Sequence, residues 1–227
     1  MTVATSATGG MPGMDMATGE MGLSLGAFLI AWAAMMAAMM LPAVTPVVRL
    51  YARAAAAGRV APAGYFVSGY LAIWLLSGLP AYLLWRVMGM PLMEAEPWAL
   101  RVAGATLVAA GIYQLSPLKR ACLRHCRSPM SFFMRGGRRL ARPAGATWAG
   151  TVHGLFCFGC CIGLMLVLVI TAAMQPLWAA VIAAAVFVER TVRWGESFSM
   201  LVALGLTTLG GAALTYPAFA AALIQGV

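Results

Sequence analysis

Long apolar runs separated by short polar segments dominate the sequence. Six such runs stand out, at residues 23–48, 63–85, 98–115, 148–174, 176–188 and 198–224. An α-helix rises 1.5 Å per residue, so about 20 residues cross a hydrocarbon core of about 30 Å. The pattern therefore predicts an all-α fold, a polytopic transmembrane bundle of six helices.

The fifth and sixth runs depart from a simple span. Residues 176–188 are short for a complete crossing before Glu189 and Arg190. This segment can cross if Arg190 and Arg193 extend their side chains to the interface, or it can re-enter the face it left. In the sixth run, Pro217 predicts a kink.

Outside the apolar runs, two segments are polar. Residues 1–21 are polar and Met-containing, with no Lys or Arg, and predict a flexible tail rather than the basic start of a signal peptide. Residues 22–227 then form a single transmembrane helical domain with a basic loop at about 116–146. Small residues four apart allow helices to approach closely; the candidate pairs are Gly64 with Ser68 and Ala105 with Ala109.

The distribution of charged residues predicts how the helices are oriented across the membrane. Only 9% of the residues are charged and 63% are hydrophobic, whereas soluble domains carry about 25% charge. All of the 15 Lys and Arg residues except Arg86 and Arg101 follow the first, third or fifth run. The positive-inside rule places those loops in the cytoplasm and both termini outside, which in a bacterial inner membrane is the periplasm. Charges grouped at the ends of apolar runs also argue against nucleic acid as a partner.

The fourth apolar run carries a cluster of soft metal ligands. At about 100° per residue, one helix face presents an imidazole, three thiols and a thioether, from His153, Cys157, Cys160, Cys161 and Met165. Soft sulfur ligands select Cu(I), Zn(II) or iron–sulfur chemistry. The alternative is that the cysteines are small packing residues of a buried helix.

The first run carries a second sulfur face, formed by Met36, Met39 and Met40. Thioethers bind Cu(I) but bind Zn(II) poorly, so a Met series can hand on a copper ion. These residues and the cysteines both reach mid-membrane depth, which allows them to meet. The alternative is that these methionines only fill the core.

A third group lies in the basic loop after the third run. A helix would place Cys122, His125 and Cys126 on one face, where they could accept a metal ion at the cytoplasmic side; ordinary reduced cysteines are the alternative. Glu189 with Arg190 is a further candidate, because an acid near the bilayer is functional by default. Its partner would be Arg190, Arg193 or the basic loop, and a purely structural ion pair is equally compatible with the sequence.

These motifs together resemble a bacterial family of predicted metal-binding integral membrane proteins of unknown function. The matching pieces are Trp32-x3-Met36-x2-Met39-Met40-x-Pro42, Tyr113-x2-Ser116-Pro117-Leu118-Lys119-x2-Cys122-x3-Cys126-Arg127-x-Pro129, Gly154-x2-Cys157-x2-Cys160-Cys161 and Glu189-Arg190. The family pattern favours Lys where this chain has Arg190. The resemblance implies a membrane location and metal binding, and it implies no reaction.

The leading hypothesis is copper handling in the inner membrane, by transport or by delivery to a cuproenzyme or metallochaperone. Cu(I) is the expected metal and zinc is possible. The sequence has no phosphate-binding loop and no Ser/His/Asp arrangement, which favours a non-enzymatic role without catalytic residues. Two alternatives stay open: an accessory or assembly subunit of a larger membrane complex, and a thiol–disulfide oxidoreductase that uses Cys157 and Cys160.

Overall fold

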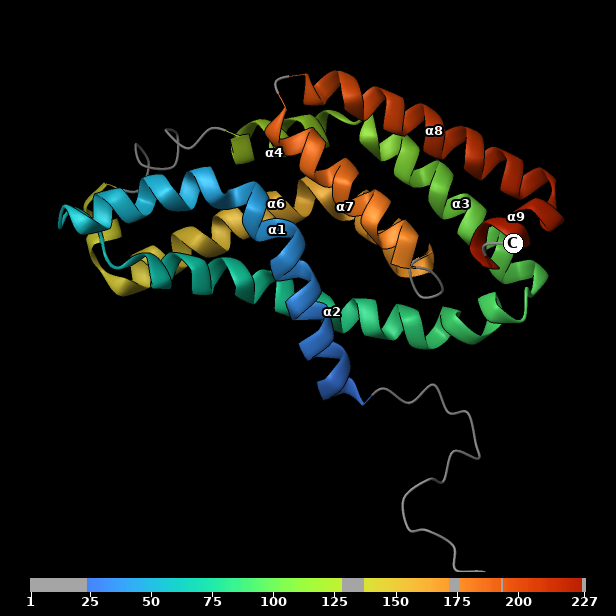
Figure 1. The fold of residues 1–227 in the computed structure, drawn as a ribbon, viewed down its shortest axis with the longest axis horizontal. Coiled ribbons are helices and arrows are strands. Elements are labelled where there is room, and N and C mark those ends of the chain that lie inside the picture. Colours follow the sequence, from blue (N-terminus) through green and yellow to red (C-terminus); the bar gives the residue numbers. More distant parts are fainter. Residues whose placement is uncertain (1–23, 128–136, 172–175, 193, 226–227) are drawn as a thin grey trace, which may run out of the picture.

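The chain folds into a bundle of helices, shown in Figure 1. It is a computed structural model, and it describes residues 24–127, 137–171, 176–192 and 194–225. The predicted tail at residues 1–21, and Arg193, lie outside these ranges. The elements of the described residues are α1 (Leu25–Ala56), α2 (Ala63–Met93), α3 (Pro97–Gln114), α4 (Pro117–Arg127), η1 (Gly137–Ala141), α6 (Pro143–Thr171), α7 (Pro176–Thr191), α8 (Gly195–Thr215) and α9 (Pro217–Gln225).

Prolines and one capping serine set many of the helix ends. The helices α3, α4, α6, α7 and α9 each begin at a proline, whose missing N–H would be unpaired in a first turn anyway. The hydroxyl of Ser24 accepts a hydrogen bond from the Ala27 amide and caps α1. Pro42 and Pro46 lie inside α1, which changes direction partway along its length in Figure 1.

Four of the six apolar runs form helices of membrane-spanning length among the described residues. In the part of the chain that the structure describes, four helices are long and apolar enough to cross a membrane: α1, α2, α6 and α8. The helices α3 and α4 pass the same test only together, bent by 64° at their junction, which raises the count to five. The short α7 is not among these candidate spans, and Pro217 separates α8 from α9 where the sequence predicts a kink. The all-α prediction is thus confirmed, with four to five candidate spans among the described residues, and the predicted sixth span and the orientation of the termini stay predictions.

Two helix pairs form the most closely packed parts of the bundle, α2 with α6 and α3 with α8. A Cβ atom added at Gly150 would overlap the Phe66 carbonyl oxygen, and one at Gly69 would overlap that of Thr147. The prediction that Gly64 with Ser68, and Ala105 with Ala109, allow close helix packing is wrong. A Cβ at Gly64 would meet nothing within 4 Å, and Ser68, Ala105 and Ala109 do not belong to the buried core.

The arrangement of the remaining helices positions the buried polar residues. Figure 1 shows α7 between the α2/α6 and α3/α8 pairs, with α4 beside the end of α7 that carries Glu189. The helix α4 packs on both α6 and α7. Large apolar side chains such as Leu83, Ile112 and Leu201 are 63–64% exposed, which suits a surface that faces lipid.

Candidate metal centre

Three cysteine thiols of α6 lie together in the core. Cys157, Cys160 and Cys161 are at most 2% exposed. The Sγ atoms of Cys160 and Cys161 are 3.7 Å apart, and the Cys160 thiol donates to the Cys157 carbonyl oxygen at 3.1 Å. Positions i, i+3 and i+4 of an α-helix lie on one side, so these three residues share one face of α6.

A fourth thiol reaches the same cluster from α4. The Cys126 side chain packs, partly buried, against the cluster that contains Cys157 and Cys160, near enough to interact with both thiols. One turn earlier on α4, Cys122 packs against the backbone of α6, because a Cβ at Gly159 would stand 3.1 Å from the Cys122 Sγ. The structure therefore joins the two cysteine groups that the sequence suggests as separate sites.

A single cationic group lies among the thiols of α6. The Arg190 guanidinium donates to the Sγ atoms of Cys157 at 2.6 Å, Cys161 at 2.8 Å and Cys160 at 3.2 Å. It also donates to the Cys157 carbonyl oxygen at 2.7 Å, and its Nε has no partner among the described residues. Within the described ranges, no three His, Cys, Asp or Glu side chains are arranged to hold a metal ion. The Arg190 guanidinium lies among the three α6 thiols, which would have to converge on a metal ion to bind it.

Aromatic residues of α2 complete one side of this cluster. The Tyr70 hydroxyl and the Cys157 Sγ are 3.0 Å apart, and Tyr70 packs edge-on against Trp74. The Trp74 carbonyl oxygen accepts a hydrogen bond from Trp32 Nε1 of α1 at 3.0 Å. Sequence reasoning missed Tyr70. Its signal was a phenol inside an apolar run, four residues from both Phe66 and Trp74 on one helix face.

The acid beside Arg190 has a different partner. Glu189 Oε2 accepts from Lys119 Nζ of α4 at 2.7 Å, and both side chains are at most 2% exposed. Of the partners considered from the sequence, the structure selects the basic loop, within which α4 forms. Gln114 of α3 donates to Glu189 Oε1 at 3.0 Å and accepts from Lys119, and Ser199 of α8 accepts from Lys119 at 3.3 Å.

The histidine and methionine candidates lie around the cluster. His153 packs against the rings of Phe66 and Tyr70, at centroid distances of 5.9 and 6.0 Å. His125 stacks on Phe156 with ring centroids 3.9 Å apart. The thioether residues belong to the same hydrophobic cluster as the cysteines: Met36, Met40 and Met165 are buried, and Met39 packs against that cluster while partly exposed.

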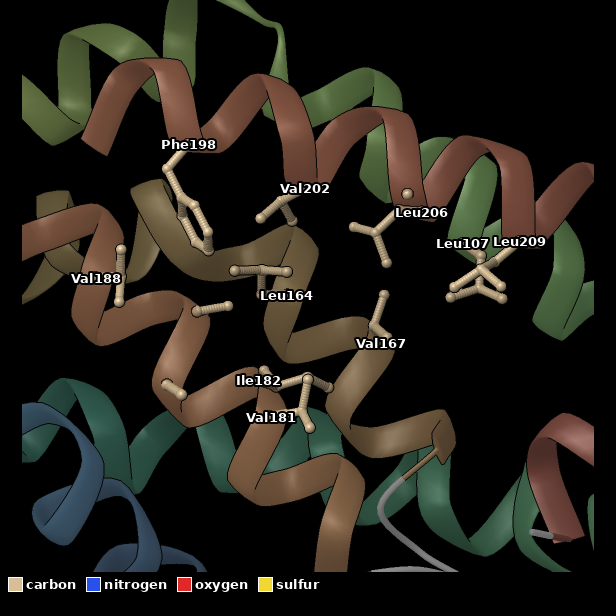
Figure 2. Close-up of a pocket in the computed structure, with 13 residues that line it drawn as sticks. Leu107, Leu164, Val167, Val181, Ile182, Val188, Phe198, Val202, Leu206 and Leu209 are labelled. Carbon is tan, nitrogen blue, oxygen red and sulfur yellow. The ribbon is translucent and has the colours of Figure 1, made fainter. Parts of the chain in front are cut away.

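An apolar groove of about 440 Å³ lies along another part of α6, as Figure 2 shows. Leu164 and Val167 of α6 line it opposite Val202 and Leu206 of α8, and α7 contributes Ile182. Every lining residue is apolar or glycine. The groove offers no metal ligand, so the thiol cluster is the better candidate for copper chemistry.

One comparison with known proteins decides the family. A family model described as a copper chaperone, PpoB2, matches residues 29–213. The chain belongs to the PpoB2 copper chaperone family. The match includes all five cysteines, both histidines, the α1 methionines and the Glu189–Arg190 pair. No curated protein and no solved structure matches the chain.

Membership of this copper chaperone family confirms the central prediction. The chain is a copper-handling protein with candidate membrane helices, and its function is copper delivery. A chaperone implies a copper-receiving partner, and this family is of a kind that is typically not enzymatic. The metal expected from the sulfur ligands is thus the metal of the family.

Proposed function

We propose that the chain carries Cu(I) among the thiols of Cys126, Cys157, Cys160 and Cys161 and delivers it to a copper-receiving protein. The observation that carries this proposal is that the Cys126 side chain of α4 meets the thiols of α6, to which the buried Arg190 guanidinium donates. Thiolate sulfur is the ligand type that favours Cu(I), and copper is the cargo of the family.

The position of the Arg190 guanidinium supports a monovalent cargo. Its nitrogen atoms lie 2.6–3.2 Å from three sulfur atoms, so a metal ion bound by all three thiols requires the guanidinium to leave. Guanidinium and Cu(I) each carry one positive charge. If the number of thiolates is the same in both states, exchange of one for the other keeps the charge of the buried cluster constant, which avoids the high cost of an uncompensated buried charge. Zinc, a divalent ion, would change that charge, and it is the alternative metal.

The methionines of α1 extend the proposed path. Met36 and Met40 are fully buried in the hydrophobic cluster that contains the thiols. Their thioethers, with Met39, would pass Cu(I) to the α6 thiols, since weak and exchangeable ligands suit transfer rather than storage. His153 and Met165 flank the thiols on α6 and would assist binding.

The same proposal assigns an exit. With six spans and both termini outside a bacterial inner membrane, α4 lies at the cytoplasmic face, and its many basic residues support this orientation. Cys122, His125 and Cys126 on α4 would then pass copper to the acceptor, a metallochaperone or cuproenzyme.

The decisive experiment measures bound metal. The protein is purified in detergent under reducing conditions, beside a Cys157/Cys160/Cys161→Ser triple variant, and metals are quantified by mass spectrometry. Cys122→Ser is the matched control, because Cys122 does not contact the guanidinium in any described hydrogen bond. We expect copper in the parent and in the control and none in the triple variant. Equal copper in the parent and the triple variant would disprove the site, and zinc in place of copper would disprove the assigned cargo.

A further inference from the structure

A second buried polar cluster lies beside the thiols and has no part in the proposed copper path. It brings together Gln114 of α3, Lys119 of α4, Glu189 of α7 and Ser199 of α8, all at most 5% exposed. Its centre is the ion pair between Lys119 Nζ and Glu189 Oε2, 2.7 Å apart. Four helices thus meet through side-chain hydrogen bonds at one point of the bundle.

A contribution to fold stability does not explain why the charged side chains of Lys119 and Glu189 are buried in this cluster. Burial removes each charge from water at a cost that the attraction between the partners only partly offsets. Packed apolar side chains of similar volume would stabilise the junction as well or better. A buried ion pair does, however, define one geometry, because its hydrogen bonds fail when the helices shift.

That geometry bears on the thiols through α4. Lys119, Cys122 and Cys126 are spaced i, i+3 and i+7, so they lie on one face of this helix. The helix is bent by 64° from α3 and joined to it by a short connection at Ser116, so α3 alone does not determine where α4 lies. On α7, Glu189 holds Lys119 while its neighbour Arg190 holds the α6 thiols.

We infer that the Lys119–Glu189 ion pair is a latch that positions α4, so that Cys122 and Cys126 stand against the cysteines of α6. Lys119, Glu189 and Gln114 are then positioning residues of the metal centre and bind no copper themselves. The consequence for copper rests on the proposed function, whereas the placement of α4 in the metal-free protein does not.

The test reads the distance between α4 and α6 without copper. The full chain in detergent is treated with iodine, which oxidises two adjacent thiols to a disulfide and is itself reduced to iodide. Denaturation and trypsin digestion follow, and mass spectrometry quantifies the Cys126 peptide linked to the α6 peptide. The parent should cross-link readily, because α4 packs on α6 and brings the Cys126 side chain within interaction range of Cys157 and Cys160.

Two single variants break the latch, Lys119→Met and Glu189→Gln. Each should lower the rate of this cross-link by about tenfold or more, because the remaining charge is left unpaired in the core. The exchanged pair Lys119→Glu with Glu189→Lys should restore the rate. Arg124→Gln is the matched control on the same helix, since its pair with Glu196 is exposed, and it should cross-link as the parent does.

A paired apolar replacement, Lys119→Met with Glu189→Leu, separates positioning from folding. It should unfold at or above the temperature of the parent and still cross-link slowly. Cross-linking at the parental rate in this variant would overturn the latch. If the single variants bind copper and cross-link as the parent does, the latch is refuted and the proposed function stands. If the single variants cross-link slowly but the parent binds no copper, the proposed function is refuted and the latch stands.

Discussion

Replacing Gly150 with alanine tests whether the close approach of α2 and α6 positions the thiol cluster. The added methyl group would overlap the Phe66 carbonyl oxygen and stand 3.1 Å from the Tyr70 amide nitrogen. Both are backbone atoms, which cannot rotate away as a side chain can, so the two helices must separate. Tyr70 contacts Cys157, two helical turns beyond Gly150, and the separation should therefore disturb the thiols as well.

The expected loss of stability follows from two opposed effects. Alanine is favoured over glycine inside a helix by about 1 kcal/mol. Overpacking of a close-packed interior costs about 1–3 kcal/mol, and the upper end applies because the clash falls on backbone. The free energy of unfolding of Gly150→Ala should thus fall by about 2 kcal/mol, as measured by equilibrium unfolding in mixed micelles.

Gly205→Ala is the matched control for this prediction. Gly205 lies within α8, and a Cβ there would meet nothing within 4 Å, so the variant should gain up to about 1 kcal/mol. Copper binding should weaken in Gly150→Ala and stay unchanged in Gly205→Ala. The reasoning is refuted if the two variants are equally stable.

Three further predictions test contacts in and around the metal centre. Cys126→Ser should weaken Cu(I) binding by at least about tenfold in a chelator competition, the loss typical of even an outer partner of a metal site, whereas Cys122→Ser should weaken it less. The double variant Met36→Leu and Met40→Leu preserves volume and should cost less than about 1.5 kcal/mol in stability, yet slow copper loading in stopped-flow measurements; an unchanged loading rate would exclude the thioether path. Tyr70→Phe removes the hydrogen bond to Cys157 and should lower the free energy of unfolding by about 1 kcal/mol, and parental stability would contradict a stabilising role for that bond.

Local patterns in the sequence predict the helices and the ligand face of α6. Apolar runs predict helices long enough to cross a bilayer, and a spacing of three and four residues specifies one helix face, so the sequence alone groups Cys157, Cys160 and Cys161. The doubtful status of the fifth run likewise agrees with α7, which is too short to count among the candidate spans.

Contacts between distant segments could not be predicted in this way. Nothing in the periodicity around Ser116 and Pro117 states that α4 turns back onto α6, and this turn alone brings Cys126 to Cys157. For the same reason the sequence could not choose among the basic partners of Glu189. The choice depends on which lysine or arginine the tertiary packing brings near.

The close contacts made by small residues also depend on tertiary structure that the sequence does not specify. The spacing of small residues leads to the wrong pairs, although helices do touch backbone to backbone at other glycines. Which glycines touch depends on the rotation of each helix about its axis. Gly69 and Gly150 lie where α2 and α6 meet, whereas Gly64 faces open space.

Because its cysteines converge, the natural chain can be labelled chemically in one region. All five cysteines of the sequence stand in or against one cluster, formed by α4 and α6. A sulfhydryl reagent applied to the intact protein therefore has a single region in which to react. Its uptake reports directly on whether that region is open, oxidised or loaded, without the engineering of a cysteine-free background.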